Sequence, residues 1–433
     1  MPVKVAKRVA VLGAGPAGLS MAKFLNDAGI SCKVFESNGR VGGKSESLRI
    51  GEHVVEMGTS YTTLEHRIVK EWLRNYGQPL TRLGDARFDG ARVVDFVKKG
   101  GGKPLLLQIL TFMRHLTRLR RRLLKASPNA EVLTEASMTT LDWIRKLDLP
   151  KMELALYRLQ TAQGYGRLDE TSIGQTALWC KPKFIASGVF NRLSMPDQGW
   201  SDLWNSIAEE LDVELNSKVL KIVRDADGVD VVQSGRVERF DAIVCAIPVD
   251  SFAALTEPTD AERYVSSHVH WANYTTCLVA AENWFTDHRV SGLSAALAPG
   301  AEGGKLIGGR YEGYEEELGG HLYVTGQVSN GLTPNELNEV LRADIAGQGA
   351  TVKSVIRQRI WRYFPRYDLT SMRDGILDRL RDMQGEQRTW YTGATFSHEL
   401  ISSIVQFNEE LSAKIVAQKY DKVKSSRSDV TVS

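Results

Sequence analysis

The sequence of 433 residues has few cysteines, no long apolar run and almost no net charge. Its four cysteines show no CxxC or metal-type spacing, which excludes a disulfide framework and a cysteine-ligated metal site. No uninterrupted apolar run approaches the roughly 18 residues that cross a membrane, so no transmembrane segment is expected. The basic stretch from Met1 to Arg8 runs directly into an apolar strand, unlike a signal peptide. These absences indicate a cytoplasmic protein whose cysteines are buried free thiols.

Catalytic side-chain signatures are also absent. The sequence shows no nucleophile elbow, no Ser-His-Asp or paired-carboxylate pattern, no metal-ligand cluster and no nucleic-acid patch. The net charge of +3 by itself says little about partners. A chain of this length exceeds one compact core and suits two intertwined domains.

The first 36 residues contain a dinucleotide-binding pattern. An apolar strand at 8–12 is followed at once by GxGxxG, then by apolar residues at helical spacing and a second strand that ends in an acid. The first glycine permits the turn, the second lets the backbone approach a pyrophosphate, and the third brings the helix close to the sheet. The acid would accept hydrogen bonds from ribose hydroxyls. The expected cofactor contacts here are Gly13, Gly15, Pro16, Ala17, Gly18 and Glu36.

The segment after Glu36 narrows the choice of dinucleotide. Gly39-Arg40-x-Gly42-Gly43-Lys44 places cations and permissive glycines where the chain turns back beside the pyrophosphate. With this GR-x-GG segment the chain resembles the FAD-containing amine oxidase and phytoene desaturase superfamily. The resemblance implies FAD rather than NAD, with Arg40, Gly42, Gly43 and Lys44 at the cofactor.

Three later segments extend the resemblance. In HVVEMGTSY (53–61), it implies that Met57, Gly58 and Thr59, together with Glu56, lie beside the flavin. At 213–248, strands and a meander end in VCAIP, and Val219 is expected to meet the adenine through its backbone. At 389–414, a strand, a Thr-Gly turn and a long terminal helix would return to the flavin. That segment brings Gly393 and Ala394 to the cofactor, and we expect His398 on the helix surface.

The resemblance gives an α/β fold. It implies a Rossmann-like FAD-binding domain of the GR-x-GG type, a mixed-sheet substrate domain and an inserted helical subdomain. The expected boundaries are 1–80, 195–255 and 385–433 for the FAD-binding domain, 81–194 for the helical substrate or lid subdomain, and 256–384 for the substrate-binding β-sheet domain. No cysteine lies in the C-terminal segment, so thioether attachment there is excluded and the FAD is expected to be non-covalent.

A basic amphipathic helix is predicted at 105–125. Nine basic residues and no acid lie between Lys98 and Lys125. Three interpretations remain open. The helix lies on an anionic membrane, making the protein peripheral to it; its cationic face meets an acidic substrate; or it packs on the core with a solvated cationic face. The apolar stripe consists of Leu105, Ile109, Phe112, Leu116, Leu119 and Leu123.

The whole chain is most similar in pattern to bacterial FAD-dependent polyunsaturated fatty acid isomerases. VGGK, EMG, GYG, W-x-YFP at 361–365 and MQG-x4-WY-x-G at 383–393 carry this resemblance. It implies that the flavin takes a hydride from a bis-allylic carbon and returns it to another carbon, with no net oxidation. The family's carboxylate-holding Arg and Phe suggest Arg87 and Phe88. The substrate-binding candidates are Arg87, Phe88, Tyr165, Phe190 and Tyr363.

Two alternatives remain. The chief one is an oxidase or dehydrogenase that acts on an amine or a hydrocarbon C–H and passes electrons to oxygen or a quinone. The other is a flavin-binding protein without turnover. For both the isomerase and the oxidase, the expected partner is a small-molecule substrate and not a nucleic acid. For the isomerase, that substrate is expected to be apolar or fatty-acyl.

Overall fold

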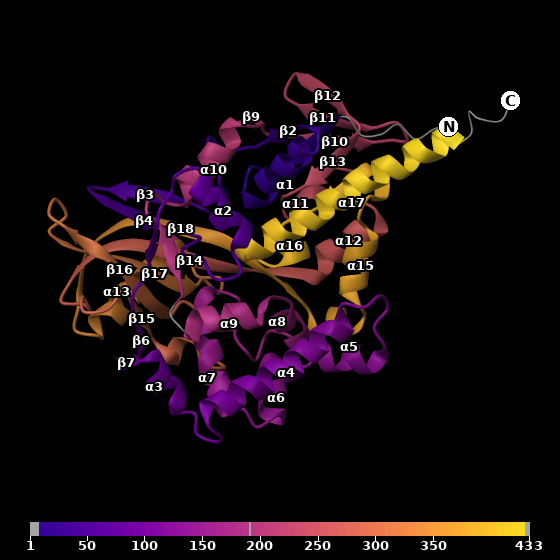
Figure 1. Cartoon of the computed structure of the whole chain (residues 1–433). Helices are drawn as coiled ribbons and strands as arrows, with labels where there is room; N and C mark the ends of the chain where they lie inside the picture. The colour runs from indigo at the N-terminus through magenta and orange to yellow at the C-terminus, as the bar shows by residue number, and fades with distance from the viewer. Residues whose placement is uncertain (1–7, 190–191, 429–433) are drawn as a thin grey trace.

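The computed structural model of the chain describes residues 8–189 and 192–428, built on two main β-sheets with a helical lobe beside them (Figure 1). The first sheet is parallel and has the order β19-β13-β1-β2-β9. Both of its faces are covered, which explains why its central strands, RVAVL and AIVC, are almost entirely apolar. Its strands are β1 (Arg8–Leu12), β2 (Ser31–Phe35), β9 (Asp212–Glu214), β13 (Ala242–Cys245) and β19 (Thr389–Tyr391).

Alternate residues of β1 point to different layers. Val9 and Val11 pack with helices on one face, whereas Ala10 and Leu12 pack towards an antiparallel meander on the other. Three segments far apart in the sequence therefore contribute to one sheet and the elements packed on it. The helices are α1 (Pro16–Asp27), α2 (Arg67–Asn75), α10 (Trp200–Glu209) and α17 (Ile401–Ser428), and the meander is β10 (Lys221–Arg224), β11 (Val229–Gln233) and β12 (Arg236–Phe240).

The second sheet has seven strands in the order β18-β14-β17-β16-β15-β6-β7. The sequence RFDGARVVDF (87–96) predicts a hairpin around Asp89-Gly90. This hairpin forms the edge of the sheet, where β6 runs parallel to β15. The expectation that this hairpin reaches residue 96 is wrong, because the chain turns into α3 at Val93 and buries Phe96 and Val97. The elements are β6 (Ala86–Phe88), β7 (Ala91–Arg92), α3 (Val93–Lys98), β14 (Val269–Glu282), β15 (Val290–Gly292), β16 (Leu306–Glu315), β17 (Gly320–Val328), α13 (Pro334–Ala346) and β18 (Thr351–Tyr367).

Helices α3 to α9 gather in a lobe away from the parallel sheet (Figure 1). The predicted helix at 105–125 is α4 (Leu105–Leu123), and Thr139 caps α6 as expected. The four C-terminal members of the α4 stripe are buried in the core and the other two are partly buried, so this stripe is not free to meet a membrane. The other helices are α5 (Ala130–Ala136), α6 (Thr140–Lys146), α7 (Pro150–Leu159), α8 (Ile173–Trp179) and α9 (Pro182–Val189).

The C-terminal segment differs from the expected turn and single long helix. A four-residue helix, α16 (Ala394–Ser397), follows Gly393 and ends at His398, whose φ of 91° breaks the path before α17 begins. His398 is buried against Tyr165 and Trp179, so the expected surface position is wrong. The remaining elements are β3 (Ser47–Ile50), β4 (His53–Glu56), β5 (Leu80–Arg82), β8 (Ser194–Pro196), α11 (Val249–Ala253), α12 (Asp260–His268), α14 (Leu369–Arg373) and α15 (Ile376–Asp382). Among the described helices, none combines the length and apolar composition needed to cross a membrane.

Candidate active site

A cavity of about 480 Å³ lies at the carboxyl ends of the parallel strands. We call it the nucleotide cavity. Residues from the opening motif, from the segment just before the meander and from the C-terminal turn meet in it, although more than 170 positions separate these segments along the chain. The sequence-predicted residues that line it are Gly13, Gly15, Pro16, Ala17, Glu36, Gly43, Lys44, Thr59, Val219, Gly393 and Ala394.

The glycines of the opening motif have different roles. Gly13 has a φ of 94°, which favours glycine at the turn. A Cβ on Gly18 would lie 1.8 Å from the carbonyl oxygen of Gly13, so only glycine allows α1 to sit against the turn. A Cβ on Gly15 would meet only the Cα of Gly43, at an ordinary 3.7 Å. In the protein alone, there is therefore room for a Cβ at position 15. A ligand packed against the backbone of Gly15 would clash with that Cβ.

Glu36 lies at the end of β2 and lines the nucleotide cavity. Its Oε2 accepts a hydrogen bond from the backbone N–H of Ala14 at 2.9 Å. Its Oε1 accepts from the backbone and side chain of Asn38, at 2.9 and 2.7 Å. The carboxylate is thus fixed at the cavity wall, where its remaining lone pairs suit the hydroxyls of a ribose.

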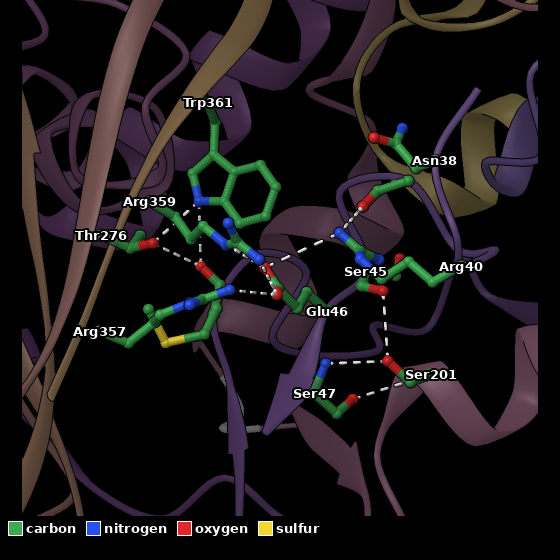
Figure 2. A network of polar contacts seen from close by, with 12 residues as sticks. Asn38, Arg40, Ser45, Glu46, Ser47, Ser201, Thr276, Arg357, Arg359 and Trp361 are labelled. Atoms are coloured by element: carbon green, nitrogen blue, oxygen red, sulfur yellow. Dashed lines mark hydrogen bonds and ion pairs between the residues drawn. The ribbon is translucent and has the colours of Figure 1, made fainter. Parts of the chain in front are cut away.

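Arg40 and Gly42 do not line the nucleotide cavity. Arg40 donates to the carbonyl oxygens of Gly43, at 2.7 Å, and Val41, at 3.2 Å, so it holds the loop together from behind. The same loop is fixed by Glu46, whose carboxylate receives a pair of hydrogen bonds from Arg359 of β18 (Figure 2). No local pattern predicts this contact, because its partners are more than 300 residues apart.

The Glu46 carboxylate is surrounded by three arginines (Figure 2). Its burial acts to raise the pKa of Glu46, but the hydrogen bonds from Arg359 and the charges of Arg40 and Arg357 outweigh that effect and lower it. Glu46 is therefore an ionised group that connects the cofactor loop to the second sheet.

A second cavity of about 200 Å³ adjoins the first, and we call it the inner cavity. Lys44, Thr59, Glu399 and Ile401 line both cavities, so a molecule bound in one lies beside a molecule bound in the other. The walls of the inner cavity are mainly aromatic and aliphatic. The sequence-predicted residues in its lining are Met57, Gly58, Phe88, Tyr165 and Tyr363, with Lys44 and Thr59 at the shared boundary.

An ion pair marks the boundary between the two cavities. The Nζ of Lys44 lies 2.6 Å from Glu399 Oε1 and stands over the rings of Trp271 and Tyr363. The other carboxylate oxygen of Glu399 accepts from the backbone N–H of Phe364 at 3.0 Å. Both groups are thus held in place, and Glu399, which sequence reasoning missed, carries no unpaired charge into the inner cavity.

Trp361 and Thr276 fix the segment that the resemblance places beside the flavin. The indole Nε1 of Trp361 donates to Thr276 Oγ1 at 2.8 Å and to the carbonyl oxygen of Met57 at 3.2 Å (Figure 2). Thr276 Oγ1 donates to the same carbonyl at 2.7 Å. The backbone of Met57 is therefore anchored to two strands of the second sheet.

The substrate-binding candidates separate into two groups. Phe88, Tyr165 and Tyr363 line the inner cavity. Arg87 does not, because it lies on the opposite face of β6 and forms an ion pair with Asp287 at 2.8 Å. It lines another cavity, of about 520 Å³, between α3, α4, α7 and α9, which we call the outer cavity. Phe190 lies outside the described residues.

A glycine-rich turn, an acid at the end of the second strand and an adjoining apolar cavity are typical of an FAD-dependent enzyme of the oxidoreductase type. The sequence model of the protein family described as flavin containing amine oxidoreductase matches residues 16–365 of this chain. The chain therefore belongs to this family. Its cofactor is therefore FAD, for which the lining of the nucleotide cavity is suited. The four cysteines, all within the described residues, are buried and line neither the nucleotide cavity nor the inner cavity.

Individual relatives agree with this family. Polyamine oxidase 2 of Arabidopsis thaliana is 26% identical over 259 residues, which cover 56% of this chain and 51% of that protein. L-amino acid oxidase Cdc18 of Crotalus durissus cumanensis is 39% identical over 77 residues, or 18% of this chain and 16% of that protein. The chain thus matches about half, or less, of the length of these curated relatives.

Solved structures show the same fold over nearly the whole chain. The CLA-producing fatty acid isomerase from P. acnes superposes with a TM-score of 0.81 at 19% identity, covering 94% of this chain and 98% of that one. Wild-type putrescine oxidase bound to putrescine superposes with a TM-score of 0.71 at 16% identity, covering 95% and 99%. The expected fold class is confirmed, and both isomerases and oxidases share it.

Proposed function

We propose that this enzyme moves a double bond in an unsaturated fatty acid or related lipid without net oxidation. The observation that carries the proposal is the charge of the inner cavity. Its described lining contains two carboxyl groups, Glu56 and Glu399, and neither offers a free negative charge to a substrate. Its lining also includes Arg158, which has no carboxylate partner among the described residues, whereas Arg310 in the same lining is paired with Glu312. A cationic amine would therefore meet unfavourable charge, whereas a fatty acid anion would not.

Glu56 is neutral in this setting. Its Oε1 accepts hydrogen bonds from the backbone N–H of Trp200 and the hydroxyl of Ser47, both at 2.8 Å. Burial raises the pKa of Glu56 to about 8, so the group is mostly protonated at neutral pH. Glu399 is already neutralised by Lys44, as described above.

The bound FAD would supply the group that takes up and returns a hydride, so no acid or base from the protein is required. The chain's own residues would hold the acyl chain against the aromatic and aliphatic walls and exclude water from it. We propose that FAD contacts the predicted residues lining the nucleotide cavity, while Gly18, Arg40 and Gly42 support that lining from behind. The overall likeness to the fatty acid isomerase from P. acnes supports the proposed isomerase function.

An oxidase acting on an amine or a hydrocarbon C–H, with oxygen or a quinone as acceptor, is the second candidate. It is favoured by the stacked pair of Tyr165 and Tyr363, whose rings lie 6.2 Å apart at an angle of 17° in the inner cavity. Such aromatic walls also suit a neutral amine. Polyamine oxidase 2 is among the relatives.

Anaerobic incubation of the FAD-loaded enzyme with linoleate separates the two candidates. An isomerase forms a conjugated diene, seen by its ultraviolet absorbance, over many turnovers and ends with oxidised flavin. An oxidase bleaches its flavin once, stops, and forms peroxide when air is admitted. Bleaching by putrescine without any diene from linoleate would refute the isomerase proposal.

A further inference from the structure

Arg158, near the end of α7, lies where the inner and outer cavities meet and lines both of them. Its guanidinium group forms no hydrogen bond or ion pair with any residue in 8–189 or 192–428. Arg158 is partly buried, and its side chain faces these cavities. Arg224 and Arg310 behave differently, since Arg224 pairs with Glu262 and Arg310 pairs with Glu312. A cation that is partly removed from water and lacks a partner is costly, so its setting points to a ligand that carries a negative charge.

The polar neighbours of Arg158 are already engaged with one another. The hydroxyl of Tyr61 donates to Gln163 Oε1 at 2.8 Å, and Gln163 Nε2 donates to the backbone oxygen of Arg158 at 3.3 Å. Burial lowers the pKa of Arg158, which agrees with a guanidinium removed from bulk water. The five N–H donors of the guanidinium thus remain for a ligand, and their planar geometry fits a carboxylate.

We propose that Arg158 binds the carboxylate of the substrate at the junction of the two cavities. This inference rests on the proposed function, because it assigns one end of a fatty acid. The acyl chain would then fill the inner cavity towards Lys44 and the nucleotide cavity, and the outer cavity would be the entrance. The reverse orientation would place alkyl carbons against an unpaired charge.

Calorimetric titration of the FAD-loaded enzyme with palmitate and methyl palmitate tests this assignment without turnover. In Arg158→Gln, the dissociation constant for palmitate should rise about 30-fold, as expected for a lost charge-assisted contact. That for the methyl ester should change less than about threefold. Arg87→Gln is the matched control, since Arg87 lines only the outer cavity and is paired with Asp287. Equal losses for acid and ester, or a larger loss in Arg87→Gln, would overturn the proposal.

Thermal melting distinguishes an anchor from a structural residue. Arg158→Met should raise the melting temperature of the ligand-free holoenzyme, because it removes a partly buried charge that has no partner. A fall would mean that Arg158 supports the fold, and it would contradict the proposed role. If palmitate binding depends on Arg158 but linoleate is not isomerised, the anchor stands and the isomerase proposal fails. If linoleate is isomerised equally well by Arg158→Gln, the anchor fails alone.

A separate surface feature surrounds the outer cavity. Leu106, Leu107 and Leu110 at the start of α4 and Val94 of α3 are 66, 51, 57 and 44% exposed. We call these four residues the docking patch. They are distinct from the buried α4 stripe. Figure 1 shows α3 and the start of α4 at the outer edge of the helical lobe, on the opposite side of the molecule from the C-terminal helix.

Basic residues predominate around the docking patch. Lys99, Lys103 and Arg114 are exposed, and the sequence from Lys98 to Lys125 contains no acid. The exposed acid Asp95, next to Val94, is paired with Lys98 at 3.5 Å. Val94 and Lys98 also line the outer cavity. We infer that the docking patch rests on a bilayer that contains anionic lipids, with the leucines in its interface and the cations at its headgroups. The outer cavity then opens beside the lipid from which an acyl substrate enters.

Sedimentation with vesicles tests the docking patch. The wild-type holoenzyme should sediment with vesicles of phosphatidylcholine and phosphatidylglycerol at low salt and be released at high salt. Leu106→Ser/Leu110→Ser should bind at least about tenfold more weakly. Val223→Ser/Val237→Ser is the matched control, because these residues are 40 and 62% exposed on the meander. Absence of wild-type sedimentation at low salt, or equal binding by both variants, would refute the inference.

Discussion

Replacement of Glu56 by glutamine should remove a specific dependence of stability on pH. Glu56 is 1% exposed, and burial raises its pKa from 4.5 to about 8. The folded protein therefore holds this proton where the unfolded chain has lost it. Its contribution to stability is fully present below about pH 4.5 and is lost as the pH rises towards about 8. Glutamine keeps the acceptor for Trp200 and Ser47 but does not titrate.

The size of the effect follows from the two pKa values. For each unit of pH between the two pKa values, the free energy of unfolding of the wild type falls by about 1.4 kcal/mol. Between about pH 5.5 and pH 8, it should therefore fall by about 3 kcal/mol relative to that of Glu56→Gln. For 433 residues, an unfolding entropy of about 0.9 kcal/mol/K converts this to about 3 °C in melting temperature. Above about pH 8 the difference should change little.

Melting of both holoenzymes by differential scanning fluorimetry from about pH 5.5 to pH 9 checks this prediction. Glu46→Gln is the control, because the arginines around Glu46 lower its pKa. Glu46 stabilises the fold above its unfolded pKa of about 4.5 and loses that effect only as the pH falls through its lower folded pKa. That variant should melt lower by a constant amount across the same range. Parallel pH profiles for wild type and Glu56→Gln would show that Glu56 is ionised in the fold and would refute the reasoning.

Two further substitutions separate cofactor contacts from structural support. Gly15→Ala should leave the FAD-free protein as stable as wild type, because its Cβ has ordinary space, yet weaken FAD binding at least about tenfold; Gly18→Ala should lower the melting temperature of the FAD-free protein as well. Equal behaviour of the two in melting and in fluorimetric FAD titration would contradict the assignment. Asn408→Ala should cost about 2–4 kcal/mol in urea unfolding, since fully buried Asn408 donates to Ala17 and Ser20 and accepts from Thr392. A loss below about 1 kcal/mol would show these contacts to be dispensable.

The sequence was most informative where a local pattern imposes a local structure. An apolar run, GxGxxG and a terminal acid fix a strand, a turn and a helix within 36 residues, and the structure has β1, α1 and β2 there. That Val219 and Gly393 belong to the same site as Gly13 was predicted only from the family resemblance, because no local sequence pattern brings these distant residues together. The breaks at Val93 and His398 were missed because both depend on burial in the helical lobe, which the local pattern does not contain.

Arg87 and Arg158 show why the substrate contacts were harder to predict than the cofactor contacts. Adjacency made Arg87-Phe88 resemble a carboxylate clamp, but neighbours on a strand point to opposite faces. Phe88 faces the inner cavity, and Arg87 consequently faces the outer one. Arg158 sits on a helix of the least specific segment, and only the packing of α7 reveals that its charge lacks a partner among the described residues. The proposed carboxylate anchor is therefore marked by an unmet charge rather than by a motif.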